Sequence, residues 1–206
     1  MMALYLYRYK KMKKNIDNLL GLKYDIGTKE GRNRMLTRLG TDYFEQIYRL
    51  LQESFPEDEY RTDKEQKELF GRKEYRVYGK VMEESGQLQA FISLWQFEQF
   101  AFIEHFAVNP DFRNRGIGEL VIHKIIRMLS TPVCLEVELP DNELAKRRIG
   151  FYSRNGFYLN EYSYIQPPIS KGRKPLPLRI MTYGGTVTKE EFHNIKEVLY
   201  HRVYGV

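Results

Sequence analysis

Apolar residues recur at spacings of three and four in several stretches of the chain, which is the pattern of helices that bury one face. In the clearest stretch the stripe consists of Ile117, Leu120, Val121, Ile125, Met128 and Leu129. The pattern predicts helices over residues 44–55, 63–70, 116–129, 142–155 and 188–204. Thr188 and Glu191 have the spacing of a capping box, so we expect the last helix to begin at Thr188.

Between these stretches lie runs of apolar, β-branched and aromatic residues that predict strands. They cover residues 35–39, 74–82, 87–97, 100–108, 131–139, 157–166 and 176–183. The short polar link Glu83–Gly86 predicts a hairpin, and the almost wholly apolar run 100–108 predicts a strand buried on both faces. The predicted order begins with antiparallel strands. A strand–helix–strand–helix segment follows, and then a second set of antiparallel strands. This order predicts an α/β (α+β) fold with a mixed sheet and helices on both faces.

Residues 1–34 lack such a pattern. Runs of Lys and Arg alternate there with Gly21, Gly27 and Gly31, which break any helix. We therefore expect a basic, loosely ordered N-terminal extension over residues 1–34. A single domain is expected over residues 35–206, with the late β segments and the closing helix as part of it.

The composition excludes several classes of protein. No stretch approaches the roughly 18 consecutive apolar residues of a membrane helix, and no signal peptide is evident, so we expect a cytoplasmic protein with no membrane partner. Cys134 is the single cysteine, which excludes an intrachain disulfide, and we expect no metal. The net charge of +6 is spread among acidic residues and accompanies no nucleic-acid-binding motif, so we expect no nucleic-acid partner.

The strongest local feature is the segment Arg113–Gly118, which links a predicted buried strand to a predicted amphipathic helix. Its glycines let the backbone approach a ligand closely, and the first N–H groups of the helix are free to bind an anion. Arg113 and Arg115 add positive charge where a pyrophosphate would lie. In isolation, the same residues would also suit a simple turn with solvated arginines.

A dinucleotide-binding fold is the sharpest alternative for this segment. Glu138 lies 20 residues after Gly118, at the end of the next predicted strand, where an acid that binds the ribose would lie. Val121, however, stands where the third small residue of that motif belongs. The link from Val108 to Gly118 is also longer than the tight turn of a dinucleotide-binding unit. Both points count against this alternative.

Two segments together resemble the motifs of the GNAT family of N-acetyltransferases. Residues 103–118 contain a hydrophobic strand, a V-x-P link and the family's (Q/R)-x-x-G-x-(G/A) sequence, which opens a helix. Asn142, Ala145 and residues 151–157 are similar to the second motif, N…A…(L/F)-Y-x-x-x-G-F. The resemblance covers about residues 35–165. It implies the GNAT fold, a central, mostly antiparallel twisted sheet with helices on both faces.

The resemblance implies an acetyl-CoA-dependent N-acetyltransferase that transfers the acetyl group directly to a primary amine. Acetyl-CoA (CoA) would lie between the strands at 102–108 and 133–138, with its pyrophosphate on the glycine loop and its pantetheine along the first strand. The cofactor-binding residues so implied are Phe106, Ala107, Val108, Arg113, Asn114, Arg115, Gly116, Ile117, Gly118 and Asn142. From the sequence alone, Asn142 would equally be the N-cap of its helix.

Two side chains are candidates for acid–base chemistry. Tyr152 stands at the family's tyrosine position and would be the general acid, because a phenol can donate to the departing sulfur without carrying charge. Glu104 would be the general base, since desolvation in an apolar strand should raise the pKa of a carboxyl. Each also has a purely structural alternative, Tyr152 as a packing residue and Glu104 as the partner of an arginine or of His105. We expect His105 to point to the opposite face of the strand.

The acceptor pocket is the least specified part of the site. The resemblance places acidic and aromatic residues there, which suit a cationic amine, namely Phe55, Glu57, Glu59, Tyr60, Trp95, Tyr164 and Gln166. The acceptor amine is not identified, and we favour a small molecule over a protein. A homodimer is an open expectation, because homodimers are the commonest oligomers. The alternative function is a non-catalytic acyl-CoA-binding module that regulates a partner through the helix at 188–204.

Overall fold

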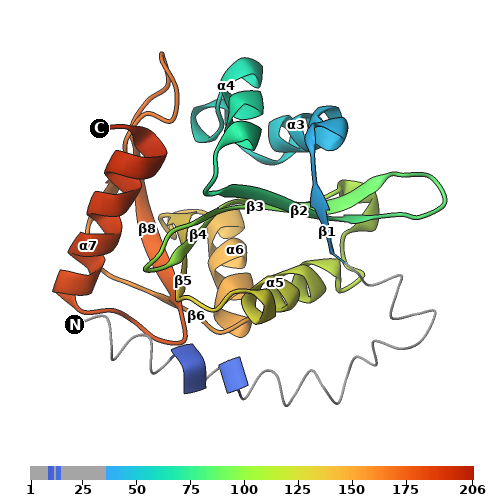
Figure 1. Cartoon of the computed structure of the whole chain (residues 1–206). Helices are drawn as coiled ribbons and strands as arrows, with labels where there is room; N and C mark the ends of the chain where they lie inside the picture. Colours follow the sequence, from blue (N-terminus) through green and yellow to red (C-terminus); the bar gives the residue numbers. More distant parts are fainter. Residues whose placement is uncertain (1–8, 12, 15–35) are drawn as a thin grey trace.

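A computed structural model describes residues 9–11, 13–14 and 36–206 of the chain. Within these residues eight strands form one sheet (Figure 1). They are β1 (Thr37–Leu39), β2 (Tyr75–Val81), β3 (Leu88–Gln96), β4 (Ala101–Val108), β5 (Val133–Glu138), β6 (Phe157–Leu159), β7 (Tyr164–Gln166) and β8 (Leu176–Tyr183). Their spatial order is β1-β2-β3-β4-β5-β8-β6, with β7 also paired to β8. Strands β4 and β5 pair in parallel and the other pairs are antiparallel, so the expected mixed, mostly antiparallel sheet is confirmed.

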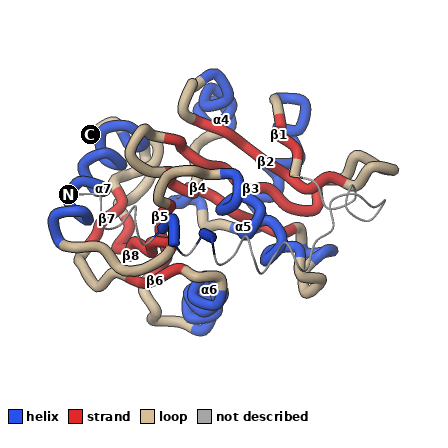
Figure 2. Tube along the Cα trace, turned by 60° about the horizontal axis from the view of Figure 1, so that its bottom comes forward, coloured by secondary structure: helices blue, strands red, loops and turns tan. Residues whose placement is uncertain are grey.

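Helices cover both faces of this sheet, as the sequence predicts (Figure 2). They are α3 (Phe44–Ser54), α4 (Asp63–Glu68), α5 (Ile117–Met128), α6 (Glu143–Arg154) and α7 (Lys189–Leu199). Short 3-10 turns occur at η1 (Thr41–Tyr43), η2 (Glu57–Glu59), η3 (Leu69–Gly71) and η4 (Pro110–Phe112), and α7 continues into the π-helix η5 (Tyr200–Tyr204). The predicted capping box of Thr188 and Glu191 is present at the start of α7. Among the described residues, no helix is both long and apolar enough to cross a membrane.

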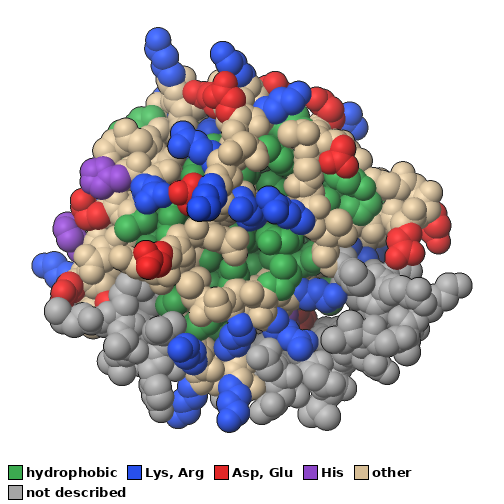
Figure 3. Space-filling view, viewed as in Figure 1, with side chains coloured by type: hydrophobic (Ala, Val, Ile, Leu, Met, Phe, Trp, Pro, Cys, Tyr) green, Lys and Arg blue, Asp and Glu red, His purple; other side chains and the backbone are tan. Residues whose placement is uncertain are grey.

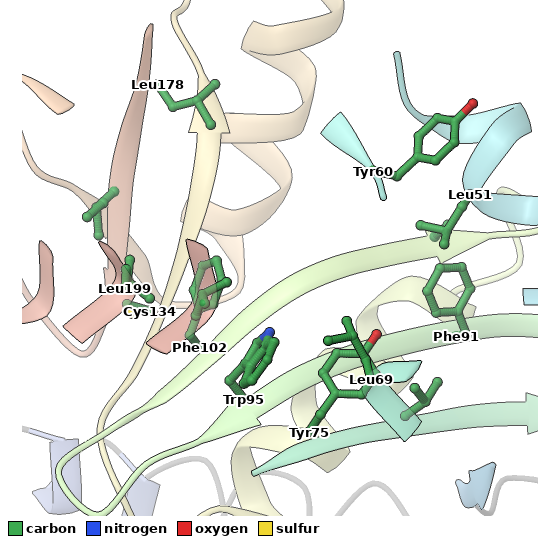
Figure 4. Close-up of a cluster of buried hydrophobic side chains, with 14 of the residues drawn as sticks. Leu51, Tyr60, Leu69, Tyr75, Phe91, Trp95, Phe102, Cys134, Leu178 and Leu199 are labelled. Carbon is green, nitrogen blue, oxygen red and sulfur yellow. The ribbon is translucent and has the colours of Figure 1, made fainter. Parts of the chain in front are cut away.

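The two faces bury separate hydrophobic clusters. The first cluster joins α3 and α7 to one face of the sheet, and Figure 4 shows Trp95, Phe102 and Cys134 within it. The second cluster joins α5 to the other face and includes Tyr152 of α6. Because successive strand residues alternate between the faces, the sheet forms the shared middle layer of both clusters.

The parallel pair β4–β5 separates part of the way along. Pairing covers Ala101 to Ile103 on β4 and Val133 to Leu135 on β5, and no later residue of either strand continues it. At the same level β4 has a bulge, since Ser93 of β3 pairs with His105 and the next residue, Leu94, pairs with Ile103. Glu104 is thus the extra residue, which bends a strand and changes the direction of its side chains.

The predicted long strand at 157–166 is instead two short strands, β6 and β7. Asn160 lies between them, and its side-chain amide donates to the Ile180 carbonyl and the Thr182 hydroxyl, both at 3.0 Å. Its side-chain oxygen accepts from the N–H of Val187 at 2.9 Å. These bonds hold the buried Asn160 in place between β6 and β7, which both pair with β8. The prediction of one continuous strand is therefore wrong.

Most of the predicted extension, residues 1–34, lies outside the described residues. Residues 9–11 and 13–14 are helical, which differs from the loose order expected there. Tyr9 is fully buried, its hydroxyl donates to the Leu129 carbonyl at 2.8 Å, and its ring meets Tyr183 edge-on. Tyr9 therefore belongs to the second cluster, against the C-terminal end of α5.

Candidate active site

A cleft of about 850 Å³ opens where β4 and β5 separate. Its walls come from the free part of β4, the end of β5, the N-terminus of α5, one face of α6, and the segment between α3 and η2. In the space-filling view, hydrophobic side chains are exposed across the middle of one face, below a row of Lys and Arg side chains (Figure 3). A parallel pair that separates in this way opens the sheet to a ligand in the middle of the domain.

The predicted phosphate loop lies along this cleft. Gly116 is the N-cap of α5 with φ +72°, and Asn114 also has a positive φ of +61°. The N–H groups in the first turn of α5 have no partner within the helix, so they and the helix dipole form an anion site. Arg113 lines the cleft and its Nε donates to the Val108 carbonyl at 3.1 Å. Arg115 does not line it, and its guanidinium lies over the Phe112 ring instead.

One face of α6 completes the cationic end of the cleft. Leu144, Arg147, Phe151 and Arg154 recur at helical spacing and all line it. Phe151 lies close to α5, because a Cβ atom added to Gly118 would be 3.4 Å from the Phe151 ring. Glycine at position 118 therefore allows the two helices to approach. Asn142, predicted near the cofactor, does not line the cleft and is the N-cap of α6, accepting from Ala145 N–H at 2.9 Å.

Tyr152 lines the cleft from α6 and is buried, with 7% of its surface exposed. Its ring packs edge-on against Phe151 and Phe157. Burial raises the pKa of Tyr152 to about 12, so its phenol is protonated at neutral pH and can act as a donor. The structure shows the packing contacts, and the role of Tyr152 as general acid stays a prediction.

Glu104 also lines the cleft, but it is already paired. Its Oε1 atom lies 2.7 Å from Arg61 Nη1, and 2% of its side chain is exposed. Burial alone would raise the pKa of Glu104, but the charge of Arg61 and the nearby His105 outweigh burial and hold the pKa at about 2. The predicted raised pKa is therefore wrong, because the sequence did not reveal the arginine, 43 positions earlier in the chain.

The expected orientation of His105 is also wrong. The bulge at Glu104 places both side chains on the same side of β4, and His105 Nδ1 lies 3.6 Å from Glu104 Oε2. His105 Nε2 lies 2.8 Å from the carbonyl of Glu59, so this nitrogen must be the donor. The imidazole therefore ties the turn η2 to the wall of the cleft.

The structure brings Phe55, Glu59 and Gln166 to the cleft among the predicted acceptor residues. Phe55 lies between the His105 ring, 5.1 Å away, and the Arg148 guanidinium, 5.8 Å away. Burial, followed by the charge of Glu138, raises the pKa of Glu59 to about 7. Gln166 is buried, and its Nε2 atom has no hydrogen-bond partner among the described residues.

Four predicted acceptor residues do not line the cleft. Trp95 and Tyr60 are buried in the first cluster (Figure 4). Tyr164 is buried behind the cleft wall and donates to Glu136. Glu57 pairs with Arg173 and is largely exposed. Aromatic character alone did not distinguish pocket residues from core residues.

Sequence reasoning missed Glu136 as a site residue. It lies on β5, lines the cleft, and accepts hydrogen bonds from the hydroxyls of Tyr164 and Tyr204. Burial raises its pKa to about 7. A signal was available, since Glu136 and Glu138 alternate with apolar residues in an otherwise buried strand. Glu138 pairs with Arg148, and its strand belongs to a mostly antiparallel sheet, which removes the dinucleotide-binding alternative.

The separated strands β4 and β5 and the N-terminus of α5 meet at one cleft in a mostly antiparallel sheet. The profile of the Acetyltransferase (GNAT) family matches residues 44–157. A Bacteroides thetaiotaomicron protein assigned to the GNAT family of acetyltransferases is 35% identical, with a TM-score of 0.76 over 84% of this chain and 99% of that one. The chain therefore belongs to the Acetyltransferase (GNAT) family, whose members are N-acetyltransferases.

More distant solved structures share the fold alone. The ribosomal-protein-S18-alanine N-acetyltransferase of Escherichia coli is 18% identical, with a TM-score of 0.56 over 75% of this chain and 96% of that one. Arabidopsis thaliana NAA60, solved in complex with acetyl-CoA, is 15% identical, with a TM-score of 0.58 over 72% of this chain and 97% of that one. Among curated proteins, none matches the chain.

Proposed function

We propose that this chain transfers the acetyl group of acetyl-CoA directly to a primary amine of a small-molecule acceptor, with Tyr152 as the general acid. The observation that carries the proposal is the division of charge within one cleft. The part formed by α5, the loop before it and α6 is lined by Arg113, Arg147 and Arg154, and also by Glu119. The part formed by η2, β4 and β5 is lined by Glu59 and Glu136, and by Glu104 and Glu138, which are paired with arginines. A cofactor with phosphates suits the first part, and a cationic amine suits the second.

The residues at the cationic end fit acetyl-CoA. The first-turn N–H groups of α5 would bind the pyrophosphate, supported by Arg113 and the basic side chains of α6. The absence of a Cβ at Gly118 keeps the backbone accessible beside Phe151. The free part of β4, from Phe106 to Val108, offers backbone groups to an extended ligand in the way a sheet edge does. Asn114, Gly116 and Ile117 line the same region.

When bound, acetyl-CoA supplies the thioester, an activated acyl group with a thiolate leaving group. Tyr152 would protonate the departing sulfur, because its phenol is neutral at physiological pH and lies in the cleft. Glu104 would serve as a positioning residue rather than as the base, since Arg61 stabilises its charged form. The predicted homodimer and cytoplasmic location stay predictions.

A thermal-shift titration with acetyl-CoA, CoA, NAD and ATP, followed by thiol release with a panel of amines, tests the proposal. A ligand at about 100 times its dissociation constant adds roughly 2.7 kcal/mol, which raises the midpoint by several degrees. We expect shifts with acetyl-CoA and CoA, and turnover with small cationic amines. Binding without turnover of any amine would instead support the non-catalytic acyl-CoA-binding module.

A further inference from the structure

Glu136 lies at the point where β4 and β5 separate. It follows Leu135, the last residue of β5 that pairs with β4, and Glu104 follows Ile103, its counterpart on β4. Glu104 and Glu136 are therefore the first residues beyond the paired part of the two strands. Glu136 is partly exposed and lines the cleft, so a ligand in the cleft can reach it.

Two hydroxyl groups from different elements fix the carboxyl of Glu136. Tyr164 of β7 donates to its Oε1 atom, and Tyr204 of η5 donates to its Oε2 atom at 2.7 Å. Each carboxylate oxygen has two lone pairs, so each can still accept a further hydrogen bond. The two tyrosines thus hold the group without using all of its acceptor capacity.

Within the described part of the chain, Glu136 differs from the carboxyls beside it in having no ion-pair partner. Glu104 pairs with Arg61, and Glu138 pairs with Arg148. Among the residues that the structure describes, no Lys, Arg or His forms an ion pair with Glu136. Burial accordingly raises the pKa of Glu136 to about 7, which lets it exchange a proton near neutral pH.

We propose that Glu136 is the general base that takes the proton from the acceptor amine, with Tyr164 and Tyr204 as its positioning residues. This inference rests on the proposed function. An N–H bond of the ammonium breaks, an O–H bond forms on Glu136, and the amine keeps the electron pair with which it attacks the thioester carbon. The C–S bond then breaks and the sulfur takes a proton from Tyr152, while the second proton that the nitrogen loses as the amide forms passes through water in the cleft to the Tyr152 phenolate. Water removes the proton from Glu136 through the open cleft.

The other carboxyls of the cleft are less suited to this task. Glu104 is a weak base because Arg61 stabilises its charged form. Glu59 also has a raised pKa, but it lies on the turn η2, near the Glu138–Arg148 pair, and not on the separating strands. Glu136 alone among these three is bound on both oxygens by neutral donors.

The positioning residue Tyr204 lies beyond the residues that match the family profile, which end at 157. Arg61 holds the same π-helix in place, because its Nη2 atom donates to the Val203 carbonyl at 3.0 Å. A π-helical turn is uncommon and occurs often at functional sites. The last helix of the described chain thereby contributes directly to the geometry of the cleft.

The test is the pH dependence of kcat/KM for an amine from the panel that the wild type acetylates. The titratable and charged groups that face Glu136 are Glu104 and His105 of β4, Cys134 of β5, Tyr164 of β7, Tyr200 and Tyr204 of η5, and Arg61 through Glu104. We expect wild-type activity to rise through a pH of about 7. Glu136→Gln should remove this rise and lower kcat at least roughly 100-fold, with CoA binding retained.

Tyr204→Phe is the second variant, with Tyr200→Phe as its matched control. Loss of a donor to the carboxylate raises the pKa of Glu136, so Tyr204→Phe should move the rise to higher pH. The Tyr200 hydroxyl donates to the Ile165 carbonyl and not to Glu136, so Tyr200→Phe should leave the profile in place. This variant keeps the proposal testable even if Glu136→Gln fails to fold.

An unchanged profile in Glu136→Gln or in Tyr204→Phe would overturn the inference. It would also be overturned if Glu136→Gln raised only the KM for the amine, or if Glu59→Gln removed the rise instead. In each of these cases the wild type still acetylates the amine and the proposed function stands. A wild type that binds CoA but acetylates no amine would overturn the proposed function and this inference together.

Discussion

The guanidinium of Arg61 lies 2.7 Å from the carboxylate of Glu104, and the two side chains are 6% and 2% exposed. The same guanidinium donates to the Val203 carbonyl at 3.0 Å. One arginine therefore links the segment after η2, the bulge of β4 and the last helix. Of these three, the bulge lines the cleft at Glu104, and the pair holds Glu104 in place there and in the charged state.

Removing the arginine should destabilise the domain strongly. Arg61→Met leaves the Glu104 carboxylate buried without a cation, which typically costs about 3–5 kcal/mol. Adding Glu104→Gln to Arg61→Met should recover part of that loss, because the double variant no longer buries the Glu104 carboxylate without its cation. Urea unfolding of the two single variants and the double variant measures this coupling. Strictly additive losses would show that the two side chains stabilise the fold independently.

The Arg61–Glu104 pair also predicts how the stability of the fold decreases at low pH. The pKa of Glu104 is about 2 in the folded state, below its ordinary value of 4.5. Its contribution to stability is therefore present above a pH of about 4.5 and is lost as the pH falls toward 2. Glu104→Gln should show a shallower loss of stability between these values in urea titrations at several pH values. If Glu104→Gln lost stability as steeply as the wild type, other carboxyls would be responsible for the loss at low pH.

The contribution of Glu59 to stability should depend on pH with the opposite sign. Its folded pKa is about 7, raised from 4.5, so the stability that it contributes is present at low pH and is lost as the pH rises toward 7. Glu59→Gln should therefore be more stable than the wild type at pH 8, by about 1 kcal/mol after allowance for partial exposure. Thermal midpoints at pH 5 and pH 8 test this. A gain at pH 5 alone would contradict it.

Tyr152→Phe tests the general acid. The change removes one hydroxyl and keeps the ring that packs against Phe151 and Phe157. We expect kcat to fall by a factor of about 100 or more, with little change in the KM for acetyl-CoA. The matched control is Tyr158→Phe, because Tyr158 is 46% exposed on β6. An unchanged kcat in Tyr152→Phe would remove this residue from the chemistry.

Gly118→Ala tests the phosphate loop. The added Cβ would lie 3.4 Å from the Phe151 ring and 3.7 Å from the Val108 side chain, in van der Waals contact, so it would add a methyl group to the cleft wall beside the first turn of α5. We expect acetyl-CoA affinity to fall several-fold, with little loss of stability. Gly150→Ala is the control, since Gly150 lies within α6 and its added Cβ would meet only the flexible end of Arg154. Calorimetric titration with CoA distinguishes the two variants, and equal affinities would contradict the assignment.

Tyr9 links the start of the chain to the second cluster. Tyr9→Ala removes a fully buried ring and should cost about 3 kcal/mol. Tyr9→Phe removes the hydroxyl that donates to the Ile126 and Leu129 carbonyls and should cost about 1 kcal/mol. Both effects should appear as lower urea midpoints without loss of CoA binding. If Tyr9→Ala unfolds at the wild-type midpoint, the docking of this residue does not contribute to stability.

The sequence by itself determined most of the elements. Helical periodicity located α3, α5 and α7, and Arg113–Gly118 predicted the start of α5, while the anion site there stays a prediction. These are local properties, set by residues three to six positions apart, so they can be recognised without knowledge of the fold. The family motifs depend on the same short spacings, which is why the fold class was also predicted.

Tertiary structure alone decided the charge states and the acceptor side of the cleft. Arg61 and Glu104 are 43 residues apart, and Tyr204 and Glu136 are 68 residues apart. No pattern in the sequence predicts such pairs, because they depend on which strands lie next to each other. The bulge that turns His105 toward Glu104 is likewise a property of the pairing with β3. Since a pKa follows from burial and neighbours, the proposal that Glu136 is the base depends on the folded chain.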